Sequence, residues 1–224
     1  MPNMTGSKRA KRADGTATRD ALLEAAGSLI ADQGFARAAS KDIALVAGAD
    51  IASINYHFGS RAGLYQAVLV EAHRRFIRID TLQDIASLSL PAQDKLKRLI
   101  SAVMSSGPNE WHVRVLAREV LSPSGHLPTL EANEIVPKIQ IVLRILADLS
   151  GLPADSPKLR LSLASIIAPC AMMLVAAPNL TVAASDIRQM PRGALIDHLS
   201  TFALGGLDAV SRRAQNPVST GAHK

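Results

Sequence analysis

Three glycines, Gly34, Gly48 and Gly59, lie at the ends of segments whose apolar residues repeat with helical spacing. Glycine adopts the left-handed conformation that ends a helix without steric cost. Short helices separated in this way, with a glycine-containing turn between the second and the third, are typical of the helix-turn-helix. The pattern therefore predicts a tri-helical unit near the N-terminus.

The residues that flank these glycines set the expected helix boundaries. The first helix is predicted to begin at Thr18, which can act as its N-cap, and to end before Gly34. Its apolar residues lie at i, i+4, i+7 and i+8 and so form one stripe. The members of this stripe are Leu22, Ala26, Leu29 and Ile30.

Three more helices are expected after Gly34. The second is predicted at 40–47, with Ile43 and Val46 turned inward. The third is predicted at 51–57, where Asp50 can cap its N-terminus. Ser60 can cap a fourth helix that reaches to about residue 80.

The amino-acid composition favours helices along the whole chain. Hydrophobic residues make up 48% of the sequence but aromatic residues only 3%, and Ala and Leu are strong helix formers. We therefore predict an all-α protein with an N-terminal tri-helical helix-turn-helix domain and a larger C-terminal helical domain. Its predicted parts are a disordered basic arm at 1–16, the helix-turn-helix at 17–65, the second helical body at 66–214 and a disordered tail at 215–224. Pro137 and Pro169 are expected to kink or split helices of this body.

Positive charge gathers in the N-terminal third. The chain carries a net charge of +6, which permits a polyanionic partner. Residues 1–78 hold 11 Lys and Arg against 7 Asp and Glu, a net of +4, and residues 79–224 hold 14 against 12, a net of +2. The densest part is the run from Lys8 to Arg12. This run either makes weak phosphate contacts or is a solvated tail.

The segment 51–65 reads IASINYHFGSRAGLY and contains the third predicted helix. Ile54 and Phe58 are four residues apart and can form its buried face. The residues expected to point partly outward are then Ile51, Ala52, Ser53, Asn55 and His57. Asn can bond adenine through two hydrogen bonds, and Ala or Ile can contact a thymine methyl group. Ser, Tyr and His can donate to phosphates, which fix register and not sequence. Arg61 begins the fourth helix, where backbone N–H groups also favour a phosphate.

Together with Asp42-Ile43-Ala44 and Ala47-Gly48-Ala49, this segment resembles the TetR family of bacterial regulators. Within that family it is similar to the subgroup with a CecR-type C-terminal domain. The resemblance covers residues 18–65, and beyond residue 80 it is limited to helical character and the stretch 118–137. It implies that Ile51, Ala52 and Asn55 face base edges. It also implies that the DNA backbone is contacted by Ser40, Lys41, Ser53, Tyr56, His57 and Arg61.

Four residues depart from the family pattern. Ala39 stands where Thr is usual, which removes a hydroxyl, and Asp50 stands where Ser or Asn is usual, which adds a charge that repels phosphate. Arg61 replaces a Lys and keeps its charge, and Ala62 replaces a Glu.

Each candidate contact also has a structural alternative. Tyr56 can be a core aromatic residue whose hydroxyl finds a partner, and Asn55 can be merely solvent-exposed. His57 can act as a cation that stabilises the C-terminal end of the helix dipole.

Two apolar segments of the second body, 159–177 and 194–210, have the composition of buried helices. The resemblance implies that such helices form a four-helix homodimer interface and that operators are pseudo-palindromic. The alternative is that both helices belong to the core of a monomer. In the second segment the apolar residues are Leu195, Leu199, Phe202, Ala203 and Leu207.

The resemblance also implies a small-molecule effector between the dimer helices and the DNA-binding unit. Side chains that can line its site are Met104, Trp111, Arg114, Met172 and Met173. At helical spacing, Met and Trp can equally be plain core residues.

The predicted function is therefore a transcriptional regulator. It is expected to be a repressor that binds double-stranded operator DNA as a homodimer and is released by its effector. The alternative is a helical dimeric interaction module that has lost strong DNA affinity, to which Ala39 and Asp50 point.

Other classes of function find little support in the sequence. The six histidines show no zinc-helix spacing, and there is no nucleophile-elbow or phosphate-binding glycine pattern, so we expect no enzyme, metal or cofactor. The single Cys170 is interpreted as a small buried residue and fits a reducing cytoplasm. The apolar stretch 163–177 is shorter than a bilayer span requires and is interpreted as a buried helix, with no signal peptide before it.

Overall fold

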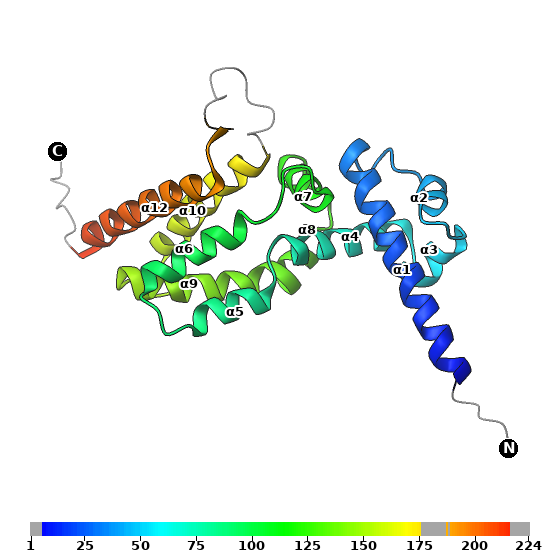
Figure 1. Ribbon diagram of the computed structural model, residues 1–224, viewed down its shortest axis with the longest axis horizontal. Coiled ribbons are helices and arrows are strands. Elements are labelled where there is room, and N and C mark those ends of the chain that lie inside the picture. The colour runs from blue at the N-terminus through cyan, green and yellow to red at the C-terminus, as the bar shows by residue number, and fades with distance from the viewer. Residues whose placement is uncertain (1–5, 176–186, 188, 216–224) are drawn as a thin grey trace, which may run out of the picture. The chain divides into compact units, whose positions relative to one another are not determined.

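The computed structural model describes residues 6–175, 187 and 189–215. The described residues form helices and connecting loops and contain no strand, as the all-α prediction requires (Figure 1). The chain divides into two compact units. The first comprises Met1–Phe76 and Asn109–Glu134, and the second comprises Ile77–Pro108 and Ile135–Lys224.

The first unit contains the predicted tri-helical region and three later helices. Helix α7, which comes from far along the sequence, packs against α1 and α4 in this unit. The predicted boundary at residue 65 therefore falls inside α4, and the unit takes in residues of the expected second body. The helices are α1 (Gly6–Gln33), α2 (Ser40–Val46), α3 (Ala52–Phe58), α4 (Arg61–Phe76), α7 (Trp111–Leu121) and α8 (Leu127–Leu130), followed by the π-helical turn η1 (Glu131–Ile135) at the boundary.

The start of α1 differs from the prediction. The helix begins at Gly6, so the expected N-cap at Thr18 is wrong, and residues 6–16 of the expected disordered arm are helical. Lys, Arg and Ala are good helix formers, and no proline interrupts this stretch. The predicted stripe of α1 is buried at Leu22, Ala26 and Ile30 and half-buried at Leu29.

The predicted turns of the helix-turn-helix are confirmed. Gly34, Gly48 and Gly59 have φ values of 83°, 63° and 74°, a region that other residues enter at a cost. Asp50 caps α3, because its Oδ1 accepts a hydrogen bond of 2.9 Å from the N–H of Ala52. Ser60 caps α4 in the same way, since its Oγ accepts from the N–H of Gly63 at 3.0 Å.

One core prediction for α2 is wrong. Ile43 is buried, but Val46 is 62% exposed and Ala44 is buried in its place. The centre of the buried face lies between Ile43 and Ala44. Because each residue turns the helix by ~100°, Val46 lies about 110° around the helix from that centre. A helix of seven residues buries only this one side.

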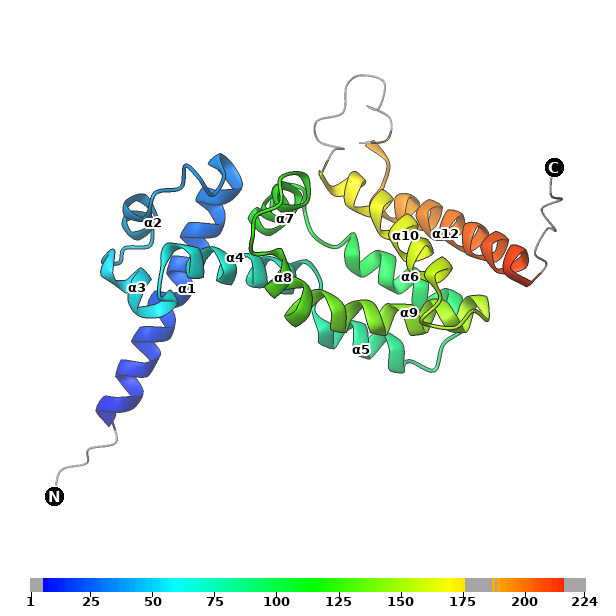
Figure 2. The same ribbon diagram turned by 180° about the vertical axis from the view of Figure 1, so that it is seen from behind.

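The second unit is a bundle whose helices α5, α6, α9, α10 and α12 pack around one core (Figure 2). Pro137 lies in the first turn of α9, where proline is tolerated. Helix α10 continues through Pro169, so of the expected kink or split the split is wrong at this residue. Burial of Ile166, Cys170 and Leu174, each four residues apart, stabilises α10 on both sides of that proline. The helices are α5 (Ile79–Ser87), α6 (Ala92–Val103), α9 (Val136–Ser150), α10 (Pro157–Val175) and α12 (Arg192–Gln215).

Helix α10 is long and apolar enough to cross a membrane by length and composition alone. The core helix of a water-soluble bundle passes the same test. In this structure α10 packs against α6, α9 and α12 and contributes Leu159, Ile166 and Cys170 to the core. Residues 176 and 177 of the predicted apolar segment, and 216–224 of the predicted tail, lie outside the described residues.

Candidate nucleic-acid interface

Helix α3 presents one face to the other helices of the first unit and the other face to solvent. Ile54 is 2% exposed and anchors the helix, which packs against α1 and α4. Asn55 is exposed, as predicted for a base-reading residue, and Ile51 and Ala52 are exposed beside it. The expected division therefore holds for Ile54 and Asn55, whereas Phe58, predicted for the buried face, is only half-buried.

The aromatic side chains of α3 differ in their surroundings. Tyr56 is 84% exposed, so the alternative of a core aromatic residue is excluded. His57 is half-buried, and its ring meets that of Tyr56 edge-on with the centroids 4.8 Å apart. Ser53 is half-buried as well. His57 also lies in the last turn of α3, so the helix-dipole interpretation stays open for this residue.

The first residues of α2 lie at the edge of the same three-helix region. Lys41 is exposed and Ser40 is half-buried. Ala39 precedes them as the N-cap and has no side-chain hydrogen bond to the helix, as expected where the usual hydroxyl is missing. Asp50, the departure that adds a negative charge, has a structural role because it caps α3.

Arg61, a predicted phosphate contact, turns toward its own protein. Its Nη2 donates hydrogen bonds to the backbone carbonyls of Phe35, Ala36 and Ala38 in the loop between α1 and α2. Its guanidinium carbon lies 4.5 Å from the centroid of the Phe35 ring. Sequence reasoning missed this role because the loop is more than twenty residues away along the chain.

Helix α7 closes the first unit against the C-terminal end of α1. Arg118 donates from Nε to the carbonyl of Ala31 at 3.0 Å and from Nη2 to the carbonyl of Asp32 at 3.1 Å. Arg114 donates to the carboxylate of Asp32 at 2.7 Å. The last carbonyls of a helix lack intrahelical partners and carry partial negative charge, so two arginines are well placed to satisfy them.

A buried hydrogen bond joins α7 to α4. The Tyr65 hydroxyl donates to Glu119 Oε2 at 2.6 Å, and Ser124 donates to Glu119 Oε1 through its N–H and its hydroxyl at 2.8 and 2.7 Å. Burial, reinforced by the hydrogen bond to Glu119, raises the pKa of Tyr65. The Tyr65 ring also stacks on that of Phe35 at a centroid distance of 4.2 Å.

Trp111 lies where α7 crosses α1. Its Nε1 donates to Glu24 at 2.9 Å, and the guanidinium carbon of Arg75 on α4 lies 5.0 Å from its ring centroid. The ring covers Gly27 so closely that a Cβ at that position would lie 2.6 Å from ring carbons.

The five predicted effector-lining residues are divided between the two units. Trp111 and Arg114 contact α1 within the first unit. The other three belong to the second unit, where Met104 is buried, Met173 is half-buried and Met172 is exposed on α10. None of these five residues lines the hollow between α6 and α12 or the groove between α10 and α12.

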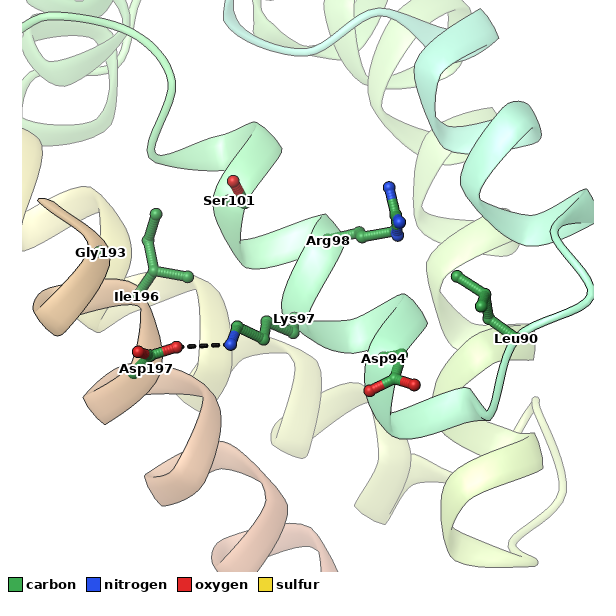
Figure 3. A pocket seen from close by; sticks show the side chains of 8 residues that line it. All are labelled: Leu90, Asp94, Lys97, Arg98, Ser101, Gly193, Ile196 and Asp197. Carbon is green, nitrogen blue, oxygen red and sulfur yellow. Dashed lines mark ion pairs between the residues drawn. The ribbon is translucent and has the colours of Figure 1, made fainter.

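A charged hollow of about 550 Å³ lies between α6 and α12 (Figure 3). Lys97 of α6 forms an ion pair of 2.6 Å with Asp197 of α12 across it. The hydrogen bond that Lys97 donates to Asp197 in this ion pair raises the pKa of Lys97. Arg98 and Asp94 line the α6 side, so opposite charges balance around the hollow.

An apolar groove of about 330 Å³ runs between α10 and α12. Phe202 and Leu161 flank it and are 71% and 70% exposed. Ala203 and Leu207, both predicted for this face, are buried at its floor. The lining is completed by Lys158, Ser162, Ser165, Ile166, Gly206 and Val210.

A helix anchored by one apolar side chain, with its polar face exposed after a glycine turn, is the architecture of a helix-turn-helix DNA-binding protein. The model of the bacterial regulatory proteins of the TetR family matches residues 22–68. The model of the C-terminal domain of the HTH-type transcriptional dual regulator CecR matches residues 92–207, more than half of the chain. The chain therefore belongs to the TetR family of DNA-binding transcription regulators and carries a CecR-type C-terminal domain. No curated protein sequence matches it.

Solved structures share this fold at low sequence identity. The fatty acid degradation regulator FadR from Bacillus halodurans is 17% identical with a TM-score of 0.65, over 84% of this chain and 98% of its own. FadR from Bacillus subtilis, solved in complex with stearoyl-CoA, is 18% identical with a TM-score of 0.66, over 83% and 97%. The superantigen PfiT is 19% identical with a TM-score of 0.64, over 83% and 95%. Likeness at this level shows the fold alone.

Proposed function

We propose that the protein is a repressor that binds a pseudo-palindromic operator through α3 and is released by a small molecule. The exposed side chain of Asn55 on a helix anchored by Ile54 carries the proposal, because this geometry leaves an amide free to pair with a base. Ile51 and Ala52 would contact bases beside it. Backbone contacts would come from Ser40, Lys41, Ser53, Tyr56 and His57.

A mobility-shift titration with DNA from upstream of the protein's own gene tests this proposal. Asn55→Ala is expected to reduce the preference for operator over random duplex, since a lost base contact costs about 1–3 kcal/mol. Asn133→Ala serves as the matched control, because Asn133 is exposed elsewhere in the first unit. If Asn55→Ala keeps the full preference for the operator, the base-reading assignment is wrong.

We further propose that the groove between α10 and α12 is the homodimer interface. A pseudo-palindromic operator requires a two-fold partner, and exposed Phe202 and Leu161 give the groove an apolar rim that a second copy can cover. Phe202→Glu is expected to convert a dimer to a monomer in light scattering after size exclusion. Leu121→Glu, a change at an even more exposed apolar residue of α7, is expected to leave the dimer intact. A monomeric mass for the wild-type protein would contradict the proposal.

The effector is proposed to bind in the C-terminal domain and to favour a state with lower operator affinity, with coupling of about 1–3 kcal/mol. The FadR structure with stearoyl-CoA makes this acyl-CoA the first probe. Stearoyl-CoA is expected to raise the operator Kd, whereas coenzyme A without the acyl chain should leave it unchanged. Equal effects of the two compounds, or none, would contradict an acyl-CoA effector. A DNA-binding regulator of this kind is proposed to work in the cytoplasm.

The alternative of an interaction module without DNA affinity rests on Asp50 and Ala39. Asp50 caps α3, and this local role explains the residue without any loss of DNA binding. An operator Kd equal to that for random duplex at physiological salt would favour the alternative.

A further inference from the structure

The side chain of Arg61 is engaged by the loop between α1 and α2. Three backbone carbonyls of that loop converge on Nη2, with the oxygen atoms of Ala36 and Ala38 at 3.2 and 3.1 Å and that of Phe35 closer still. The Nε atom is buried and has no hydrogen-bond partner. If the guanidinium of Arg61 bound a phosphate through two of its nitrogens, Nη2 and Nε would point toward solvent instead of toward the loop.

The carbonyls form a compact acceptor for a cation. Each carries partial negative charge, and hydrogen bonds from an ionised donor are about twice as strong as neutral ones. The flat guanidinium also lies over the ring of Phe35, an arrangement that a cation–π attraction stabilises. Lysine has no planar group that can lie over the Phe35 ring while a nitrogen at its edge donates to the carbonyls, so it cannot reproduce both contacts.

The loop held in this way determines where α2 begins. Ala38 is fully buried, and the N–H groups of Asp42 and Ile43 in the first turn of α2 donate to the carbonyl of Ala39 at 3.1 Å. Tyr65, one turn after Arg61 on α4, stacks on Phe35 and holds the same loop. The position of α2 thus depends on contacts made from the start of α4.

We propose that Arg61 is a positioning residue, which fixes the loop 34–39 and through it the first residues of α2, and that it does not contact phosphate. The proposal rests on the DNA-binding function proposed above. It predicts that loss of Arg61 weakens operator binding without removing a phosphate contact.

The first measurement needs no DNA. The amides of Arg37 and Ala38 both donate to the carbonyl of Gly34 at 3.2 Å, so their hydrogen exchange reports whether the loop is closed. Arg61→Lys and Arg61→Gln are both expected to speed exchange at these two amides about tenfold, the effect of losing ~1.4 kcal/mol of loop stability. Lys41→Gln, at an exposed residue of α2, is expected to leave it unchanged.

The second measurement is the salt dependence of operator binding at a temperature where every variant is folded. Both Arg61 variants are expected to lose about tenfold in operator affinity with the slope of log K against log salt unchanged. Lys41→Gln is expected to lower that slope by about one, as loss of a phosphate contact does. A purely stabilising role would leave the affinity of the folded protein unchanged.

Four outcomes overturn the proposal. They are normal exchange in both Arg61 variants, unchanged operator affinity in both folded variants, rescue of affinity by lysine, and a slope lowered by about one in Arg61→Gln. If the wild-type protein shows no preference for its operator, the proposed function fails, but the exchange experiment still decides whether Arg61 holds the loop.

Discussion

Gly27→Ala places a methyl group where the Trp111 ring covers α1. The added Cβ would lie 2.6 Å from two ring carbons, well inside van der Waals contact. The ring cannot move aside freely, because its Nε1 donates to Glu24 and Arg75 lies over its face. The substitution therefore forces α1 and α7 apart or breaks the hydrogen bond to Glu24.

The magnitude follows from two opposing effects. Overpacking a filled contact costs about 1–3 kcal/mol, and replacing Gly by Ala inside a helix gains ~0.8–1.0 kcal/mol. Gly15→Ala on the same helix isolates the second effect, because a Cβ there would meet only His57 Cε1 at 4.0 Å. The two variants should therefore differ in unfolding free energy by the overpacking cost, about 1–3 kcal/mol.

Trp111 is the only tryptophan, so its emission reports this contact directly. Urea unfolding followed by Trp111 fluorescence and by far-UV circular dichroism gives the stability of each variant. Gly27→Ala is expected to shift the native emission to longer wavelength and lower the midpoint, whereas Gly15→Ala should raise the midpoint with unchanged emission. If Gly27→Ala matches Gly15→Ala in both respects, Trp111 does not pack on α1 as the structure shows.

Tyr65→Phe removes the hydroxyl that donates to the buried Glu119 at 2.6 Å. It should lower the unfolding free energy measured in urea by about 1.5–3 kcal/mol. A double-mutant cycle with Glu119→Gln that gives no coupling energy would contradict a direct hydrogen bond. Burial lowers the pKa of His112, so the folded state resists protonation. Its contribution to stability is present above the unfolded pKa of about 6.5 and is lost as the pH falls below it. Lowering the pH from 7 to 5 should therefore decrease the urea midpoint less in His112→Gln than in wild type. Equal decreases in the two proteins would refute this. Burial raises the pKa of the Cys170 thiol to about 11, so iodoacetamide at pH 8 should label the native protein far more slowly than the urea-unfolded one, an expectation that equal rates would disprove.

Local backbone chemistry made much of the DNA-binding unit predictable. The positive φ of Gly48 and Gly59 and the caps at Asp50 and Ser60 depend on residues only a few positions apart. The outward direction of Asn55 follows from helical spacing to Ile54. Such features need no knowledge of the remaining chain, since steric limits and helical periodicity act within one or two turns.

Contacts between distant segments decided the rest. Sequence periodicity gives Trp111 and Arg114 an amphipathic helix but does not say which helix they meet, and the structure places them on α1. Arg61 has the position and charge of a phosphate contact, yet the carbonyls of a loop that precedes it by more than twenty residues bind its guanidinium. The side-chain partner of a long, flexible cation is set by whichever acceptors the packed fold brings within reach, and only the tertiary structure determines that.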